Sequence, residues 1–292
     1  MLVNKSPRFE KGRILKTEML ENLRDYPRRF LDIRYEEYSD GIIAGMKVSV
    51  EHDHLIIGRG IVKHDGHLYL LEQAYELPYA AANGLSILKI RFHAQQAQHD
   101  FVTREAEIIL TNGAEEADGE SGRSQSRDPV RELENVNFPR NLTSEPGTTS
   151  IANEIELGRF KLKEGAALRS DYQDFADMAT EFNTWSAIRA PYAAWEQPTL
   201  RPEITSCFAT ELLRCRSAEA LDTSFALLCL NSERVQREAL LQYLCSRGGE
   251  YRDYTNGEMH RQLVLILQEV SRGGRGQVRW SGQSGVNRMI VD

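Results

Sequence analysis

Four histidines are the side chains in this sequence that are best suited to metal chemistry. His52, His54, His64 and His67 lie in two short polar stretches, EHDH and KHDGH, each with an aspartate. Such ligands suit zinc or nickel if both stretches are turns at one edge of a sheet. Histidine and aspartate are also ordinary residues of solvated turns, and nothing in the sequence places the two turns on one side. We therefore expect no metal, cofactor or catalytic residue, with a metal-dependent enzyme that uses these turns as an alternative.

Sequence patterns for other catalytic chemistry are weak. KGRILKT near the start lacks the glycines that wrap backbone N–H groups around a phosphate. GQSG at 282–285 resembles part of a nucleophile elbow but has no strand-like segment before it. The four cysteines, Cys207, Cys215, Cys229 and Cys245, form no CxxC pair and are expected to be reduced core residues. These observations predict a protein that is not an enzyme.

Charge and hydropathy narrow the choice of partner and location. The net charge of −7 disfavours broad phosphate binding, so nucleic acid is not expected as the main ligand. RGGRGQVRW, with Trp280, could contact single strands, but a flexible assembly arm is favoured in an acidic chain. A nucleic-acid-binding or regulatory module remains an alternative. No apolar run is long enough to span a membrane and the start resembles no signal peptide, so we expect a soluble cytoplasmic protein.

The elements that must position any site begin with a helix. Leu15, Met19 and Leu23 recur at helical spacing within residues 13–35, and Thr17 could cap the helix. Pro27 disfavours helical geometry at the residue before it, so the chain is expected to continue in a second segment at a new angle.

From Gly41 the period changes to two, which predicts antiparallel strands. Two hairpins follow each other, and Asp65-Gly66 suits a tight type I′ turn in the second. LSILKIRF, FVTREAEIIL and IELGRFKL are further strands, with a bulge expected at Gly158. These strands predict a small sandwich or barrel.

The last third is helical in pattern, and a capping box at Thr255 and Glu258 begins the final helix. Short loops between the four expected helices predict antiparallel packing in a bundle. The aromatic stretch with Trp185, Tyr192 and Trp195 could line a groove, but a place in the core is favoured. The expected fold class is α+β. The expected divisions are 1–110 (helix and β domain), 111–150 (flexible loop or linker), 151–200 (strand and connecting helix), 201–272 (helical bundle) and 273–292 (Gly-rich tail).

One pattern in the β region is distinctive. GIIAGMKVSV (41–50), LII (55–57) and GIVKHDGHLY (60–69) together resemble the N-terminal region of phage tail-fibre and baseplate proteins. EIELGRFKL (154–162) is similar to a strand that follows in those proteins, although their proline and alanine are missing here. The resemblance covers about residues 9–110 and 153–175.

This resemblance implies a structural protein that acts by protein–protein binding. A helical C-terminal region does not suit a fibre shaft, so a baseplate component or fibre adaptor of a phage tail or contractile injection apparatus is expected. The implied partners are other tail or baseplate proteins, with several copies in a symmetric assembly. The protein would then be assembled in the cytoplasm as a component of the particle.

Overall fold

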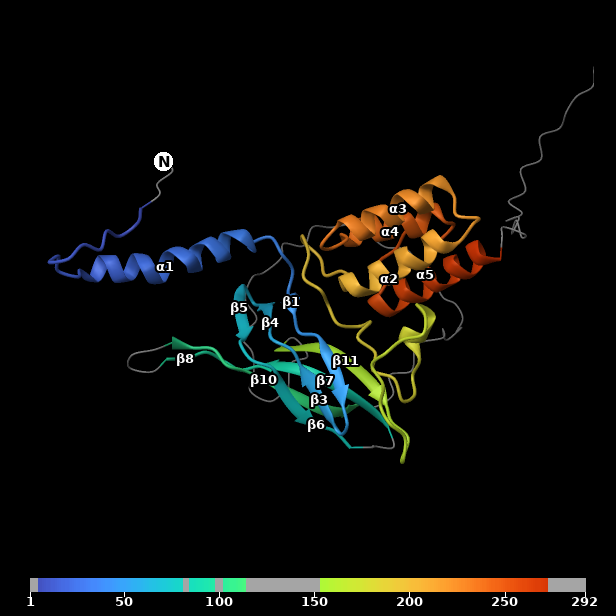
Figure 1. The fold of residues 1–292 in the computed structure, drawn as a ribbon, viewed down its shortest axis with the longest axis horizontal. Helices are drawn as coiled ribbons and strands as arrows, with labels where there is room; N and C mark the ends of the chain where they lie inside the picture. The colour runs from blue at the N-terminus through green and yellow to red at the C-terminus, as the bar shows by residue number, and fades with distance from the viewer. Residues whose placement is uncertain (1–4, 81–83, 98–101, 114–152, 273–292) are drawn as a thin grey trace, which may run out of the picture. The chain divides into compact units, whose positions relative to one another are not determined.

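The protein is described from a computed structural model that covers residues 5–80, 84–97, 102–113 and 153–272 (Figure 1). It is an α+β protein in which a helix precedes antiparallel sheets, as the sequence predicts. The expected tail at 273–292 and the expected loop from residue 114 onward lie outside the described residues. The chain divides into two compact units, Met1–Tyr172 with Met178–Pro198, and Gln173–Asp177 with Thr199–Asp292.

The first unit begins with a single amphipathic helix, α1 (Thr17–Arg34). The prediction of a break at Pro27 is wrong, because the helix continues through this proline. Proline removes one backbone hydrogen bond inside a helix. The helix is exposed throughout, so water can reach the carbonyl group that loses its partner. Thr17 is the first helical residue, and Lys16 takes the N-cap position.

In the part of the chain that the structure describes, three small antiparallel sheets and one short two-stranded pairing follow α1. Their strand orders are β1-β4-β5, β2-β3-β6 and β10-β7-β11, with β8 paired to β9. Both predicted hairpins are confirmed, as β2 with β3 and β4 with β5. The strands are β1 (Gly41–Gly45), β2 (Val48–Glu51), β3 (His54–Ile57), β4 (Gly60–His64), β5 (His67–Leu71), β6 (Tyr75–Pro78), β7 (Leu85–Phe92), β8 (Gln96–Ala97), β9 (Val102–Thr103), β10 (Ala106–Gly113) and β11 (Glu154–Lys161).

One hydrophobic core joins the three sheets. Buried side chains of β1, β3, β7 and β11 belong to the same cluster, with Leu55, Leu88 and Leu157 fully buried. Strand β11 pairs with the central strand β7 although a long segment separates them in sequence. Trp185 and Tyr192 also belong to this core, so the interpretation of the aromatic stretch as core holds for these two residues.

Local sequence signals account for the sharpest backbone features. Asp65 and Gly66 have φ angles of 48° and 71°, as a type I′ turn requires. The ladder between β11 and β7 shifts register between Glu156 and Gly158, which confirms the predicted bulge. Strand β10 continues to Gly113, into the range expected to be a loop.

Two glycines of the distinctive β pattern are required by close backbone approach. A Cβ atom on Gly60 would lie 2.5 Å from the amide nitrogen of Met46 and 2.6 Å from the carbonyl oxygen of Ala44. Gly45 has a φ angle of 67°, and its Cβ atom would lie within 2.1 Å of the Arg59 carbonyl oxygen. The pairing of β1 with β4 therefore demands glycine at both positions.

The second unit is helical. Helices α2 and α3 pack together, and α5 contacts both α2 and α4. Phe208, Phe225 and Tyr243 form its aromatic centre, and the last two rings stack at 3.9 Å between centroids. The helices are α2 (Pro202–Arg214), α3 (Ala220–Asn231), α4 (Arg237–Ser246) and α5 (Asn256–Ser271), and a short 3₁₀ helix, η2 (Ala176–Ala179), lies on the border of the two units.

The predicted apolar stripes of these helices are only partly buried. Phe225 and Cys229 of α3 lie in the core, whereas Leu221 and Leu228 are nearly half exposed. Helix α3 is apolar around most of its circumference, so its sequence could not show which side faces inward.

Candidate interaction surface

The two histidine-rich turns belong to different sheets. His52 and His54 lie at the β2–β3 hairpin, and His64 and His67 face each other across the β4–β5 hairpin. Within the described ranges, no group of three or more histidine, cysteine, aspartate or glutamate side chains is placed to hold a metal ion. The turns therefore do not form the shared metal site that their sequence would permit.

One histidine of each turn contacts a nearby aspartate. His54 Nδ1 lies 2.6 Å from Asp53 Oδ1, and this hydrogen bond keeps the pKa of Asp53 below its ordinary value. His64 is buried, stacks on Phe92 at 3.9 Å between ring centroids, and has its Nδ1 atom 3.4 Å from Asp40 Oδ2. The interpretation of His64 as a solvated turn residue is therefore wrong, because its ring packs against Phe92 of the core.

The four cysteines and Trp195 differ in how far each is buried. All four cysteines are free thiols, and only Cys229 among them is buried. Desolvation raises the pKa of Cys229 to about 12, which leaves it a neutral core residue. The expectation that Cys207, Cys215 and Cys245 are core residues is wrong, since they are half-buried. Trp195 is half exposed.

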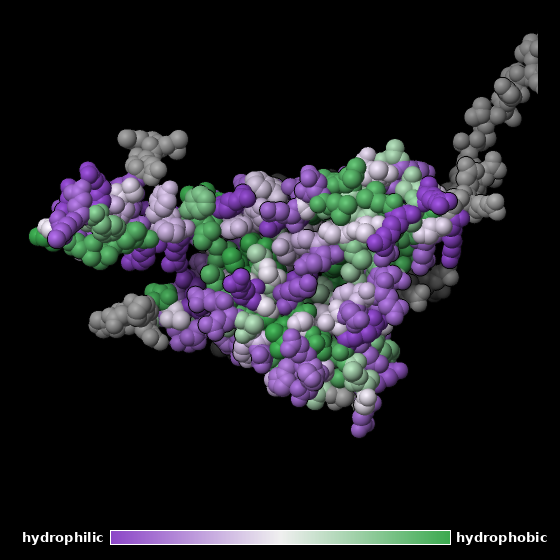
Figure 2. Space-filling model, viewed as in Figure 1, coloured by the Kyte–Doolittle hydropathy of each residue, from purple (hydrophilic) through white to green (hydrophobic). Residues whose placement is uncertain are grey.

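Among the described residues, α1 exposes more large apolar side chains than any other helix or strand. None of its residues is buried, although its sequence is strongly amphipathic. Figure 2 shows hydrophobic side chains along one side of this projecting helix and hydrophilic ones along the other. An amphipathic helix is stable mainly when its apolar face packs against another surface. The large apolar side chains that it exposes, with the preceding turn, are Leu15, Leu20, Leu23, Tyr26, Phe30, Leu31 and Ile33.

A buried lysine attaches the C-terminal end of α1 to the sheets. Lys63 of β4 is 6% exposed, and its ammonium group donates hydrogen bonds to the carbonyl oxygens of Tyr35, Glu36 and Tyr38. These carbonyl groups lie just beyond the helix, where the helix dipole favours a positive charge. The helix is thus anchored at one end while its apolar face stays open.

A hollow of about 810 Å³ lies between α1 and the neighbouring strands. Basic side chains line the hollow on both sides, with Arg28 on the helix and Arg104 in the connection between β9 and β10. Acidic side chains line it too, so its charge is mixed and does not define an anion site. Its lining residues on α1 are Arg24, Pro27, Arg28, Leu31 and Asp32.

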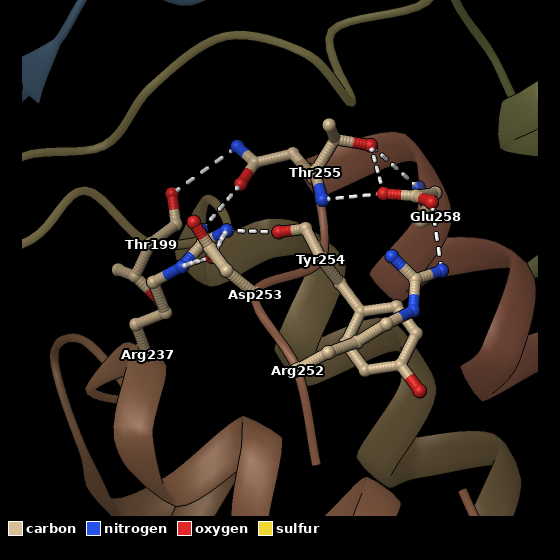
Figure 3. A network of polar contacts seen from close by, with 8 residues as sticks. Thr199, Arg237, Arg252, Asp253, Tyr254, Thr255 and Glu258 are labelled. Atoms are coloured by element: carbon tan, nitrogen blue, oxygen red, sulfur yellow. Dashed lines mark hydrogen bonds and ion pairs between the residues drawn. The ribbon is translucent and has the colours of Figure 1, made fainter. Parts of the chain in front are cut away.

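A polar network in the helical unit joins α4 to the start of α5 (Figure 3). Arg237 donates to Asp253 Oδ1 at 2.7 Å, to the Tyr254 carbonyl group and to Asn256. Beside it, the predicted capping box is confirmed: Thr255 Oγ1 accepts from the Glu258 amide at 3.2 Å. The two groups of contacts hold the connection between the helices.

Glu258 and His260 of this unit have strongly lowered pKa values. The hydrogen bonds from Arg252 and Thr255 lower the pKa of Glu258 to about 2. Burial lowers the pKa of His260 to about 4, against the opposing effect of its hydrogen bond with the Phe175 carbonyl oxygen. Both side chains have structural partners, so we assign them to stability and not to chemistry.

Comparison of the chain with protein-family models, with curated proteins and with solved structures finds no match. No helix in the described ranges has both the length and the apolar character needed to cross a bilayer. The candidate site therefore rests on the surface of α1 and its attachment. Sequence reasoning found the amphipathic pattern of this helix but not that its apolar face is left uncovered.

Proposed function

We propose that this chain is a structural subunit, a baseplate component or fibre adaptor, of a phage tail-like or contractile injection particle. The observation that carries the proposal is the exposed apolar face of α1, which is held at one end by Lys63. A protein that keeps such a face exposed has a binding surface, because large apolar patches mark sites of interaction. The subunit acts by protein–protein binding and is assembled in the cytoplasm.

The β part adds the second line of support. Residues 41–69 carry the pattern that resembles phage tail-fibre and baseplate proteins, and the glycines of that pattern serve the close approach of β1 and β4. We interpret the antiparallel part as a small sandwich or barrel, and residues 201–272 as a helical bundle. In this proposal the β part docks on partner proteins of the particle, which hold several copies in a symmetric arrangement.

Particle isolation from the native host tests this proposal. A tagged chain is expected to sediment with intact particles, and to stay in the slowly sedimenting fraction in a strain from which the particle genes are deleted. A chain that is absent from intact particles in a strain that makes both would overturn the proposal.

That negative result would leave two alternatives, which further measurements separate. Stoichiometric zinc or nickel in the purified chain, lost when His52, His54, His64 and His67 are replaced together, would favour a metal-dependent enzyme. Salt-sensitive binding of single-stranded nucleic acid would favour a regulatory module.

A further inference from the structure

We propose that the segment Gln173–Asp177, here called the latch segment, detaches from the helices of its own unit when His260 takes up a proton. The latch is closed at neutral pH and opens as the pH falls, before the helices themselves unfold. The inference rests on contacts inside the helical unit and not on the particle assignment, so either can fail without the other.

The latch segment belongs to the helical unit, whereas the residues before and after it belong to the first unit. The chain therefore enters the helical unit here, returns to the first unit at Met178, and enters the helical unit again at Thr199. Phe175 in the middle of the segment is fully buried, while its neighbours in the segment are half-buried or exposed. One buried side chain thus anchors a short and otherwise accessible segment.

Two helices hold Phe175 by its backbone and by its ring. The backbone amide of Phe175 donates to Glu211 Oε1 of α2 at 2.6 Å. Its carbonyl oxygen accepts from His260 Nε2 of α5 at 3.0 Å. Its ring contacts those of Phe208 and His260, with centroids 5.4 and 4.3 Å away. His260 therefore contacts the anchor of the latch segment through a hydrogen bond and through ring packing.

The same contacts make the closed state unfavourable for a charged imidazole. His260 is 1% exposed, and burial lowers its pKa to about 4 from an ordinary value of about 6.5. When Phe175 leaves, the ring that packs against the imidazole is gone and water can hydrate the charged form. The open state therefore binds a proton more tightly than the closed state, and protonation shifts the population toward the open state.

The two pKa values determine the size of the shift. If the pKa of His260 is about 6.5 in the open state and about 4 in the closed state, the equilibrium constant for opening rises about twentyfold from pH 7 to pH 5. The effect is small at pH 7, because His260 is largely neutral in both states. Opening of a short segment also exposes much less apolar surface than unfolding of the unit, so it requires less free energy.

Other charged or titratable groups around the latch segment include Glu211, Cys207 and Arg214 on α2 and Asp174 in the segment itself. Cys207 stays a neutral thiol in acid, because burial and the nearby Glu211 raise its pKa. Glu211 binds the Phe175 amide directly, and a protonated carboxyl group is a weaker acceptor than a carboxylate. The effect of Glu211 must therefore be separated from that of His260.

Hydrogen exchange of the full chain at pH 7 and pH 5 tests the latch. After correction for intrinsic exchange rates, protection of the Phe175 amide should fall about twentyfold between the two conditions. At pH 5 this amide should exchange at least about tenfold faster than the amide of Leu263 in the middle of α5, because it opens locally. Equal protection of the two amides would show that the segment leaves only when the helices unfold, and would overturn the proposal.

Two variants assign the effect to one side chain. His260→Gln keeps a donor for the Phe175 carbonyl oxygen and removes the titration, so the loss of protection should shrink to less than about threefold. Glu211→Gln keeps an acceptor for the Phe175 amide and should retain the twentyfold loss of about the parent size. A loss of that size in His260→Gln would overturn the proposal.

A measurement on the parent chain needs no substitution. The ring resonances of His260, followed by NMR in the folded chain, should titrate with a pKa near 4. A pKa near the ordinary value of about 6.5 would mean that the closed state does not disfavour the proton, and would equally overturn the proposal.

Discussion

The ammonium group of Lys63 lies 2.6 Å from the main-chain carbonyl oxygen of Tyr35, one residue beyond the end of α1. The same group also donates to the carbonyl oxygens of Glu36 and Tyr38, so a single buried charge binds three carbonyl groups of the segment that follows the helix. This contact connects the C-terminal end of the exposed helix to the sheets.

Lys63→Met should lower the free energy of unfolding of the first unit by about 1–3 kcal/mol. The substitution keeps the aliphatic stem but leaves three carbonyl groups without their charged donor. Denaturant unfolding measures the loss, and hydrogen exchange should rise at the amides of residues 35–38. Lys47→Met, at an exposed position, is the control and should change stability by less than about 0.5 kcal/mol. Equal effects of the two changes would contradict the anchoring role.

Gly60→Ala should destabilise the first unit by about 1–3 kcal/mol, because the new methyl group meets backbone atoms of Met46 and Ala44 that cannot move aside cheaply. Thermal unfolding followed by circular dichroism measures the effect. Gly84→Ala is the matched control, since a Cβ atom there meets nothing within 4 Å. If both variants unfold at the temperature of the parent chain, the close approach of β1 and β4 does not hold.

Thr255→Ala should lower the stability of the helical unit by about 1 kcal/mol, the usual contribution of an N-cap side chain. Thr210→Ala, in the exposed interior of α2, removes a hydroxyl group that bonds only to the preceding turn and should be neutral or slightly stabilising. Urea unfolding of both variants provides the comparison. A larger loss from Thr210→Ala than from Thr255→Ala would be inconsistent with the capping box.

Protonation of His260 should lower the free energy of unfolding of the helical unit as the pH falls. Its pKa is about 4 in the folded chain and about 6.5 when unfolded, so the unfolded state binds the proton more readily between these values. Stability from this group is therefore present in full above pH 6.5 and is lost as the pH falls toward 4, by at most about 3 kcal/mol.

His260→Gln keeps a donor for the Phe175 carbonyl oxygen and removes the titration. The difference in unfolding free energy between the parent chain and this variant should shift in favour of the variant as the pH falls from 7 to 4. Parallel stability curves over this range would show that His260 does not titrate as inferred.

The amino-acid sequence alone determined the features whose causes are local. Asp65-Gly66 specifies its turn because both residues tolerate positive φ angles, and Thr255 with Glu258 begins α5 because the two side chains satisfy backbone groups within one turn. The alternation of apolar residues likewise indicated the strands of the two hairpins.

The tertiary structure determined which parts of the chain pack against each other. Only the fold pairs β11 with β7 across a long stretch of chain, and only packing turns Phe225 of α3 inward while Leu221 stays exposed. His64 is buried because the sheet brings Phe92 beneath it, which no spacing in the sequence reveals. The exposed apolar face of α1 follows from the same principle. The amphipathic pattern shows that a helix has an apolar face, whereas the positions of the other elements determine whether anything covers it.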